Sequence, residues 1–130
     1  MTVVEQSEDL GRKAADAIFS KKGTDIVLLD VEDLFVLSDV FVIATGTSRP
    51  HVQTLAEAVE ERFREDLGIK PLRSEGQAEA EWILLDYGDI IVHLFQNGPR
   101  EYYGLERLWA DAAKVTWSEP AVSESSAEGQ

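Results

Sequence analysis

The sequence predicts a single α/β domain in which a mixed β-sheet is flanked by helices. Its 130 residues suffice for one domain with a buried core and are too few for two. Segments with apolar residues three and four positions apart, typical of helices, alternate with short apolar segments typical of strands. The strand segments are apolar on both faces, as expected of a sheet covered by helices. We assign residues 1–117 to the folded domain and residues 118–130, rich in Ser, Glu and Ala, to a disordered acidic tail.

The chain is expected to begin with one helix followed by two strands. Ser7 is a suitable N-cap for the helix, and Gly23 is a suitable stop after it. Residues 26–31 and 40–45 are the two strands, separated by a short acidic connection.

The clearest helix follows the turn Gly46-Thr47-Ser48. Ser48 can cap this helix, Pro50 fits its first turn, and Gly68 ends it. Its apolar residues share one helical face and are expected to be buried: Val52, Leu55, Ala56, Val59 and Phe63.

The C-terminal half is expected to hold an edge strand, a hairpin and a helix. The segment 70–73 can at most be an edge strand, because Pro71 cannot donate a backbone hydrogen bond. Segments 82–87 and 90–95 are joined so closely that they form an antiparallel hairpin. The last helix is expected from about Arg100 to Trp109, with Leu105 and Leu108 covering the sheet.

The stretch DYGDIIVHLF, residues 86–95, places two carboxylates and a histidine in this hairpin. A loop of Tyr87-Gly88 would set Trp82 opposite His93, whereas a loop of Gly88-Asp89 would move Trp82 two positions further along. Either two-residue loop, unlike a three-residue one, places the same six side chains on one face. They are Trp82, Leu84, Asp86, Ile91, His93 and Phe95.

This stretch is a poor candidate for catalysis or metal binding. Because each strand residue advances about 3.3 Å, Asp86 and His93 are not expected to share a close hydrogen bond. The other histidine, His51, opens the long helix, and the two histidines lack the spacing of metal ligands. We therefore interpret His93 as structural and expect no metal and no cofactor.

Composition and charge exclude several other classes of function. Twelve Lys and Arg against 25 Asp and Glu give a net charge of −13, which disfavours nucleic-acid binding and suits a basic protein partner. Acidity that merely keeps the chain soluble is the alternative. The absence of cysteine excludes disulfides and thiol chemistry. With no long apolar run and no signal-peptide pattern, a cytoplasmic protein without membrane contact is expected.

The turn Gly46-Thr47-Ser48 is the remaining enzyme-like feature. A strand, a tight turn and a helix N-terminus can bind an anion, so a nucleotide-binding or nucleotidyl-transfer enzyme is the alternative function. The glycine-rich phosphate motifs are absent, and Arg49, Pro50 and His51 follow where carboxylates for Mg²⁺ would be needed. The turn is therefore more simply interpreted as a helix cap.

All six Trp and Tyr residues lie C-terminal to position 80. Both residue types are common anchors of protein interfaces. Trp82 lies at the end of a strand, directly after an acidic segment, which favours a role in an interface. For Trp109, packing in the core is the favoured interpretation. The division of the other aromatic residues between core and interface stays open.

Five blocks of the sequence resemble, in order and spacing, the ribosomal silencing factor family RsfS, also called Iojap-like. They are TDIVLLDV, SDVFVIATGTSRPHVQTLAEAVEE, KPLRSEG, EWILLDYGDIIVHLF and REYYGLERLW. The resemblance covers the chain from about Leu10 to Trp109. It implies a nucleotidyltransferase-like fold without the catalytic carboxylates, in a protein that is not an enzyme.

The resemblance also implies a translational repressor. Members of the family bind the large ribosomal subunit through its fourteenth protein and sterically block joining with the small subunit under nutrient limitation. For this chain, a basic ribosomal protein as partner and little direct nucleic-acid contact are implied, while a homodimer stays open. The partner-binding residues carried over from the family are Trp82, Asp86, Asp89, Tyr103 and Glu106.

Overall fold

The computed structural model describes residues 3–35 and 37–120. The helices are α1 (Val3–Ser20), α2 (Arg49–Leu67), α3 (Asn97–Tyr103) and α4 (Leu105–Leu108). The strands are β1 (Thr24–Asp30), β2 (Val40–Gly46), β3 (Arg73–Glu75), β4 (Trp82–Asp86), β5 (Ile90–Gln96) and β6 (Ala113–Lys114).

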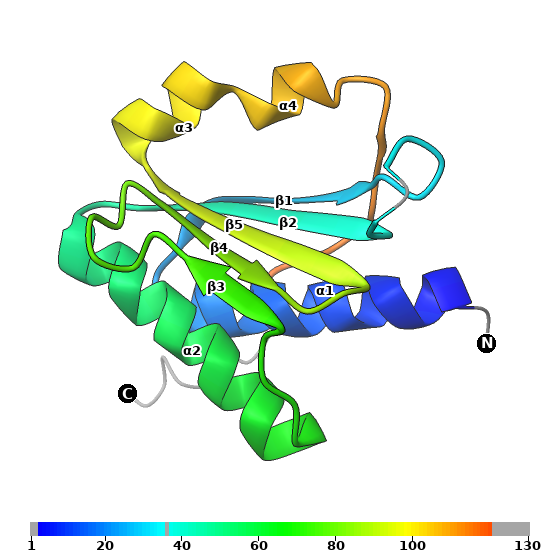
Figure 1. The fold of residues 1–130 in the computed structure, drawn as a ribbon, viewed down its shortest axis with the longest axis horizontal. Helices are drawn as coiled ribbons and strands as arrows, with labels where there is room; N and C mark the ends of the chain where they lie inside the picture. The colour runs from blue at the N-terminus through cyan, green and yellow to red at the C-terminus, as the bar shows by residue number, and fades with distance from the viewer. Residues whose placement is uncertain (1–2, 36, 121–130) are drawn as a thin grey trace.

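Within the described residues, one six-stranded sheet runs in the order β3-β4-β5-β2-β1-β6. The central pair, β2 and β5, is parallel, and the other neighbouring pairs are antiparallel. The helices α1 and α2 cover one face of this sheet, and α3 and α4 lie over the other (Figure 1). The expected α/β architecture with a mixed sheet between helices is confirmed.

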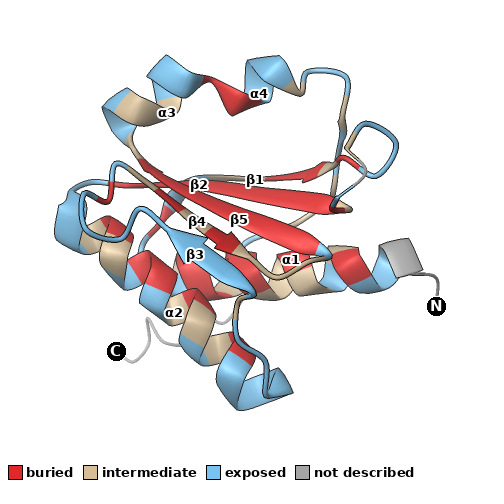
Figure 2. Ribbon diagram, viewed as in Figure 1, coloured by how far each residue is buried: buried red, intermediate tan, exposed pale blue. Residues whose placement is uncertain are grey.

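The core is divided by the sheet into two apolar clusters, with β2 and β5 buried between them (Figure 2). The larger cluster lies under α1 and α2. The five apolar residues expected on one face of α2 are the buried residues of that helix, and all five belong to this cluster. Ser48 caps α2 by accepting a hydrogen bond from the backbone N–H of His51, and Gly68 ends it in the left-handed conformation, both as predicted. The smaller cluster lies under α3 and α4 and holds the aromatic residues of the site described below.

The first helix differs from the prediction at its start. It begins at Val3, so Ser7 lies inside the helix and is not its N-cap. The buried Ser7 hydroxyl instead donates to the Asp39 carboxylate at 2.7 Å and ties α1 to the start of β2. In a sequence, a serine near the start of a helix suggests an N-cap. Here the Ser7 hydroxyl is bound instead by Asp39, which lies 32 positions away.

The β4–β5 hairpin takes the second of the two registers considered. Trp82 pairs with Phe95 and Asp86 pairs with Ile91, so the loop is Gly88-Asp89. Gly88 has a φ of 89°, and its N–H donates to the Asp86 carboxylate at 2.8 Å. The six side chains expected on one face of the hairpin therefore share it.

The C-terminal part of the fold differs most from the prediction. The single helix expected from Arg100 to Trp109 begins earlier and is split by Gly104, which adopts a φ of 56°. The split turns Leu108 into solvent, although it was expected to cover the sheet, while Leu105 is buried as expected. The short strand β6, paired with β1, was not predicted.

The segment after β6 returns to α1, where Trp117 packs edge-on against Phe19 and donates to the Asp16 carboxylate at 2.8 Å. The predicted tail over 118–130 lies mostly outside the described residues, which end at Pro120. Among those described, no helix combines the length and apolar character needed to cross a membrane.

Candidate protein-docking site

Trp82 is the half-buried centre of an aromatic group on the face of the sheet under α3. The first residue of β4, it stacks obliquely on Phe95 and on Tyr103, with ring centroids 5.0 and 4.7 Å apart. Tyr103, at the end of α3, is itself 46% exposed. Tryptophan and tyrosine are both enriched among the residues that anchor protein interfaces.

His93 fixes the orientation of this tryptophan. The indole Nε1–H of Trp82 donates to Nδ1 of His93 at 3.1 Å, so Nδ1 is an acceptor and the ring proton of the neutral histidine is on Nε2. The His93 side chain is buried, with Phe41 packed edge-on at 4.7 Å, and burial lowers its pKa to about 3. The histidine is therefore neutral at physiological pH, as a structural role requires.

A close approach of two backbones supports the exposed edge of Trp82. Gly76 has a φ of 89°, and any Cβ at this position would collide with the carbonyl oxygen of Trp82. Beside it, Glu75, Gly76, Trp82 and Leu84 line an open hollow of about 240 Å³. The hollow gives an incoming side chain apolar contact with the indole and a carboxylate at the rim.

The carboxylates of the hairpin loop lie at the far end of β4. Asp86 is four residues from Trp82, about 13 Å along the strand, so the two do not touch. One Asp86 oxygen accepts from Gly88, and the other lies 3.8 Å from the guanidinium of Arg73, which also binds Glu75 at 2.7 Å. Asp89 is exposed, and its backbone carbonyl accepts from Asp39 at the start of β2.

The remaining predicted contact, Glu106, has a partner within the chain. Arg100 binds both of its carboxylate oxygens, at 3.1 and 2.8 Å, and this lowers the pKa of Glu106. The same guanidinium donates to the Asp25 carbonyl at 2.6 Å and to the Thr45 hydroxyl at 2.8 Å. Arg100 thus fastens α3 and α4 to β1 and β2, and with them Tyr103 over Trp82.

Four side chains consequently form one elongated patch, which we name the tryptophan surface: Trp82, Leu84, Asp86 and Tyr103. Asp89 lies at its far end, and Glu106 lies behind it in the ion pair with Arg100. Sequence reasoning missed the positioning roles of His93, Gly76 and Arg100. A glycine in an exposed turn and an arginine in a helix carry no local signal of a partner far along the chain.

The enzyme-like turn is held by the chain's own hydrogen bonds. Nδ1 of His51 accepts from the Thr47 backbone N–H at 2.9 Å, and its Nε2 contacts the Lys21 carbonyl at 2.8 Å. Ser48 is engaged as the helix cap. In the part of the chain that the structure describes, no group of three or more His, Asp or Glu residues could hold a metal ion.

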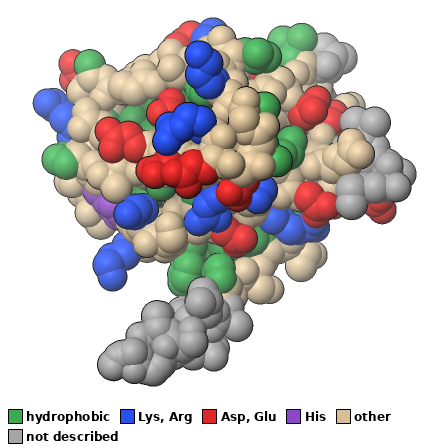
Figure 3. Space-filling view, turned by 90° about the horizontal axis from the view of Figure 1, so that it is seen from below, with side chains coloured by type: hydrophobic (Ala, Val, Ile, Leu, Met, Phe, Trp, Pro, Cys, Tyr) green, Lys and Arg blue, Asp and Glu red, His purple; other side chains and the backbone are tan. Residues whose placement is uncertain are grey.

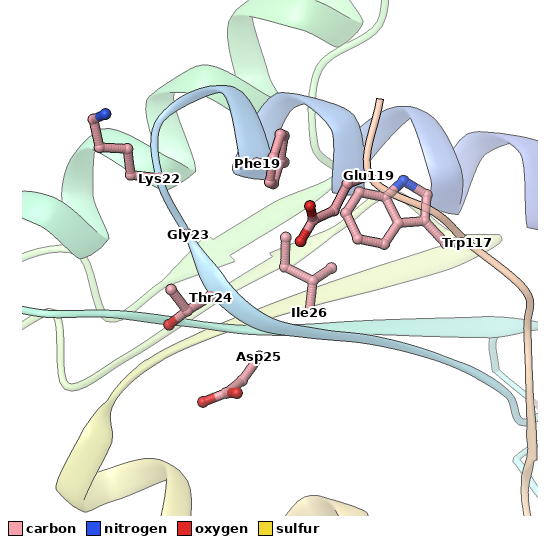
Figure 4. A pocket seen from close by; sticks show the side chains of 8 residues that line it. All are labelled: Phe19, Lys22, Gly23, Thr24, Asp25, Ile26, Trp117 and Glu119. Atoms are coloured by element: carbon pink, nitrogen blue, oxygen red, sulfur yellow. The ribbon is translucent and has the colours of Figure 1, made fainter. Parts of the chain in front are cut away.

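A larger hollow of about 460 Å³ lies between the end of α1, β1 and the C-terminal segment (Figure 4). Phe19, Ile26 and Trp117 give it an apolar wall, while Lys22 and Asp25 point away from one another (Figure 4). Glu119 is the third charged residue of the lining, and Lys22 points away from both carboxylates, so the three charged side chains do not converge on one point (Figure 4).

Comparison with known proteins identifies relatives over nearly the whole chain. Residues 4–130 match the model of a family described as "Ribosomal silencing factor during starvation". The ribosomal silencing factor RsfS of Halalkalibacterium halodurans is 37% identical over 109 residues, which cover 84% of this chain and 92% of that protein. A mouse protein named "Mitochondrial assembly of ribosomal large subunit protein 1" is 31% identical over 90 residues, 65% of this chain and 38% of its own length.

A crystal structure of a protein from Chromobacterium violaceum has a similar fold. It is 32% identical in sequence, superposes with a TM-score of 0.75, and the match covers 92% of both chains. The fold and the sequence therefore point to the same group of proteins.

Proposed function

The chain belongs to the ribosomal silencing factor family, and from this premise we propose that it represses translation by binding the large ribosomal subunit. In this proposal the contact is with the fourteenth protein of that subunit, and occupying that place sterically blocks joining with the small subunit when nutrients are scarce. The names of its relatives support a ribosome-associated silencing role. The name of the mouse relative supports the large subunit as the partner.

The single observation that carries the proposal is the construction of the tryptophan surface. Trp82 is half-buried and held in one orientation by His93, Phe95 and Tyr103, so little side-chain entropy is lost when a partner covers it. A preorganised tryptophan beside an open hollow is the arrangement expected of an interface anchor.

The charge of the chain supports a basic protein as the partner. The net charge is −13, and three carboxylates, those of Glu75, Asp86 and Asp89, lie on or beside the tryptophan surface, against one guanidinium, that of Arg73. Complementary charge accelerates association and selects the partner. The same field opposes direct binding to ribosomal RNA. A homodimer through this surface is the competing use, and it would have to open before the ribosome is bound.

Co-sedimentation with purified large subunits tests the proposal. Trp82→Ala should weaken binding at least tenfold and relieve inhibition in a light-scattering assay of subunit joining, because a central tryptophan contributes about 2 kcal/mol or more. Trp117→Ala is the matched control, since it removes the same side chain from the opposite layer of the fold. Unchanged co-sedimentation of a folded Trp82→Ala protein would remove Trp82 from the interface.

A further inference from the structure

Three exposed leucines lie on two segments outside the tryptophan surface. Leu34 and Leu37 lie in the connection between β1 and β2 and are 47% and 73% exposed. Leu108, at the end of α4, is 71% exposed. We name these three residues the leucine surface. Leu37 and Leu108 are mostly exposed and Leu34 is about half exposed, so packing in the core does not by itself explain an apolar residue at these positions.

The two segments that carry the leucine surface are held against each other. Phe35, next to Leu34, packs edge-on against Trp109, next to Leu108, with ring centroids 5.6 Å apart. Phe41 on β2 lies beneath both rings, 5.5 Å from Phe35 and 5.4 Å from Trp109. The β1–β2 connection and the chain after α4 accordingly lie side by side at one end of the sheet (Figure 1). These aromatic contacts therefore hold the two segments that carry the leucines in place relative to each other.

The surroundings of the leucine surface are acidic on the side of the β1–β2 connection. Between Leu29 and Val40 the chain has four Asp or Glu residues and no Lys or Arg. The pKa of Glu32 is raised by desolvation and then by the neighbouring carboxylates of Asp33, Asp30 and Asp39. In contrast, the face formed by α1 and α2 carries both signs of charge, intermixed and ion-paired (Figure 3).

We propose that the leucine surface is a second docking site, which takes a basic amphipathic segment of a protein partner. An apolar stripe of such a segment would cover the leucines, and its Lys or Arg side chains would meet the carboxylates of the β1–β2 connection. A second copy of this chain fits less well, because a two-fold contact through the patch would set the acidic connection against itself. The site is separate from the tryptophan surface and goes beyond the proposed function.

The probe is an 18-residue peptide of leucine and lysine whose leucines occupy one helical face. Calorimetry with the full chain should show saturable binding that weakens as salt rises. Amide chemical shifts should change at residues 31–39 and 105–112. A scrambled peptide of the same composition should bind at least tenfold more weakly, because its leucines do not form a stripe.

Three variants of the full chain separate the possible explanations. The double variant Leu37→Ser with Leu108→Ser should weaken peptide binding at least tenfold without unfolding, because both side chains are exposed. Leu72→Ser is the matched control, a leucine 77% exposed next to β3, and should leave the affinity within twofold of the unmodified chain. Trp82→Ala should also leave it unchanged, so that a failure of the proposed function does not decide this proposal.

The proposal would be overturned by the absence of saturable peptide binding, or by an equal loss in the Leu72→Ser variant. It would also be overturned if sedimentation showed that the chain self-associates and that the double variant abolishes this, since the occupant would then be a second copy.

Discussion

Lowering the pH should destabilise the folded protein through His93. Its pKa is about 3 in the folded chain, whereas an exposed histidine in the unfolded chain has a pKa of about 6.5. Between these values the unfolded chain binds a proton that the folded chain does not. The stability contributed by the neutral histidine is therefore complete above about pH 6.5 and is lost as the pH falls toward 3. Linkage gives a loss of about 2 kcal/mol from this residue between pH 8 and pH 5.

Urea unfolding followed by circular dichroism at the two pH values measures this loss. The comparison is with His93→Asn, which does not titrate and keeps an amide oxygen as an acceptor for the Trp82 indole. Any pH-independent cost of the substitution cancels when the two pH values are compared, and the carboxylates contribute equally to both proteins. The unmodified chain should therefore lose about 2 kcal/mol more than the variant between pH 8 and pH 5. Equal losses would refute the account of His93 as a buried neutral acceptor.

Two further predictions concern the supports of the tryptophan surface. Arg100→Ala should lower the free energy of unfolding by roughly 2–3 kcal/mol, since it removes the hydrogen bonds to Asp25 and Thr45 that fasten α3 and α4 to the sheet. Glu106→Gln should lower it by less in the same urea titration, and an equal loss would contradict this role. Gly76→Ala should lower the free energy of unfolding by roughly 1–3 kcal/mol, because of the positive φ at this position and the collision of the new Cβ with Trp82. Gly98→Ala is the control: its Cβ would meet no atom within 4 Å, and the free energy of unfolding should change by no more than about 0.5 kcal/mol. Similar losses in both variants would show that the contact at Gly76 does not matter.

The sequence predicted those parts of the fold whose signals are local. The signals for α2, its two caps and the spacing of its apolar residues, all lie within about twenty residues, and the structure has the helix that they predict. The hairpin could be narrowed to two registers by the length of its loop. The structure has the register in which the loop is Gly88-Asp89. In this register the Asp86 carboxylate accepts a hydrogen bond from the N–H of Gly88, which favours this loop.

The parts that were not predicted depend on contacts between distant residues. Ser7 reaches Asp39, and Arg100 reaches Asp25 and Thr45, across separations that no local pattern reveals. The two-residue strand β6 is too short to show periodicity and exists because β1 offers it an edge. The hydrogen bond from Trp82 to His93 was likewise not predicted, although the sequence placed both side chains on one face of the hairpin.

The division of aromatic residues between core and interface also required the structure. Trp82 follows Glu81 and Trp109 follows Leu108, and neither position has a pattern that separates a core from an exposed environment. Trp109 packs among Phe35 and Phe41 in the apolar cluster under α4. Trp82 instead lines an open hollow, which makes it available to a partner.

The most direct measurement of the central claim is calorimetric binding of this chain to the isolated fourteenth protein of the large ribosomal subunit. The account predicts saturable binding of one chain to one, weakened by salt because acidic and basic surfaces meet. Trp82→Ala should weaken this binding at least tenfold, and Trp117→Ala should leave it intact. Absence of binding by the unmodified chain, or equal binding by Trp82→Ala, would contradict the account.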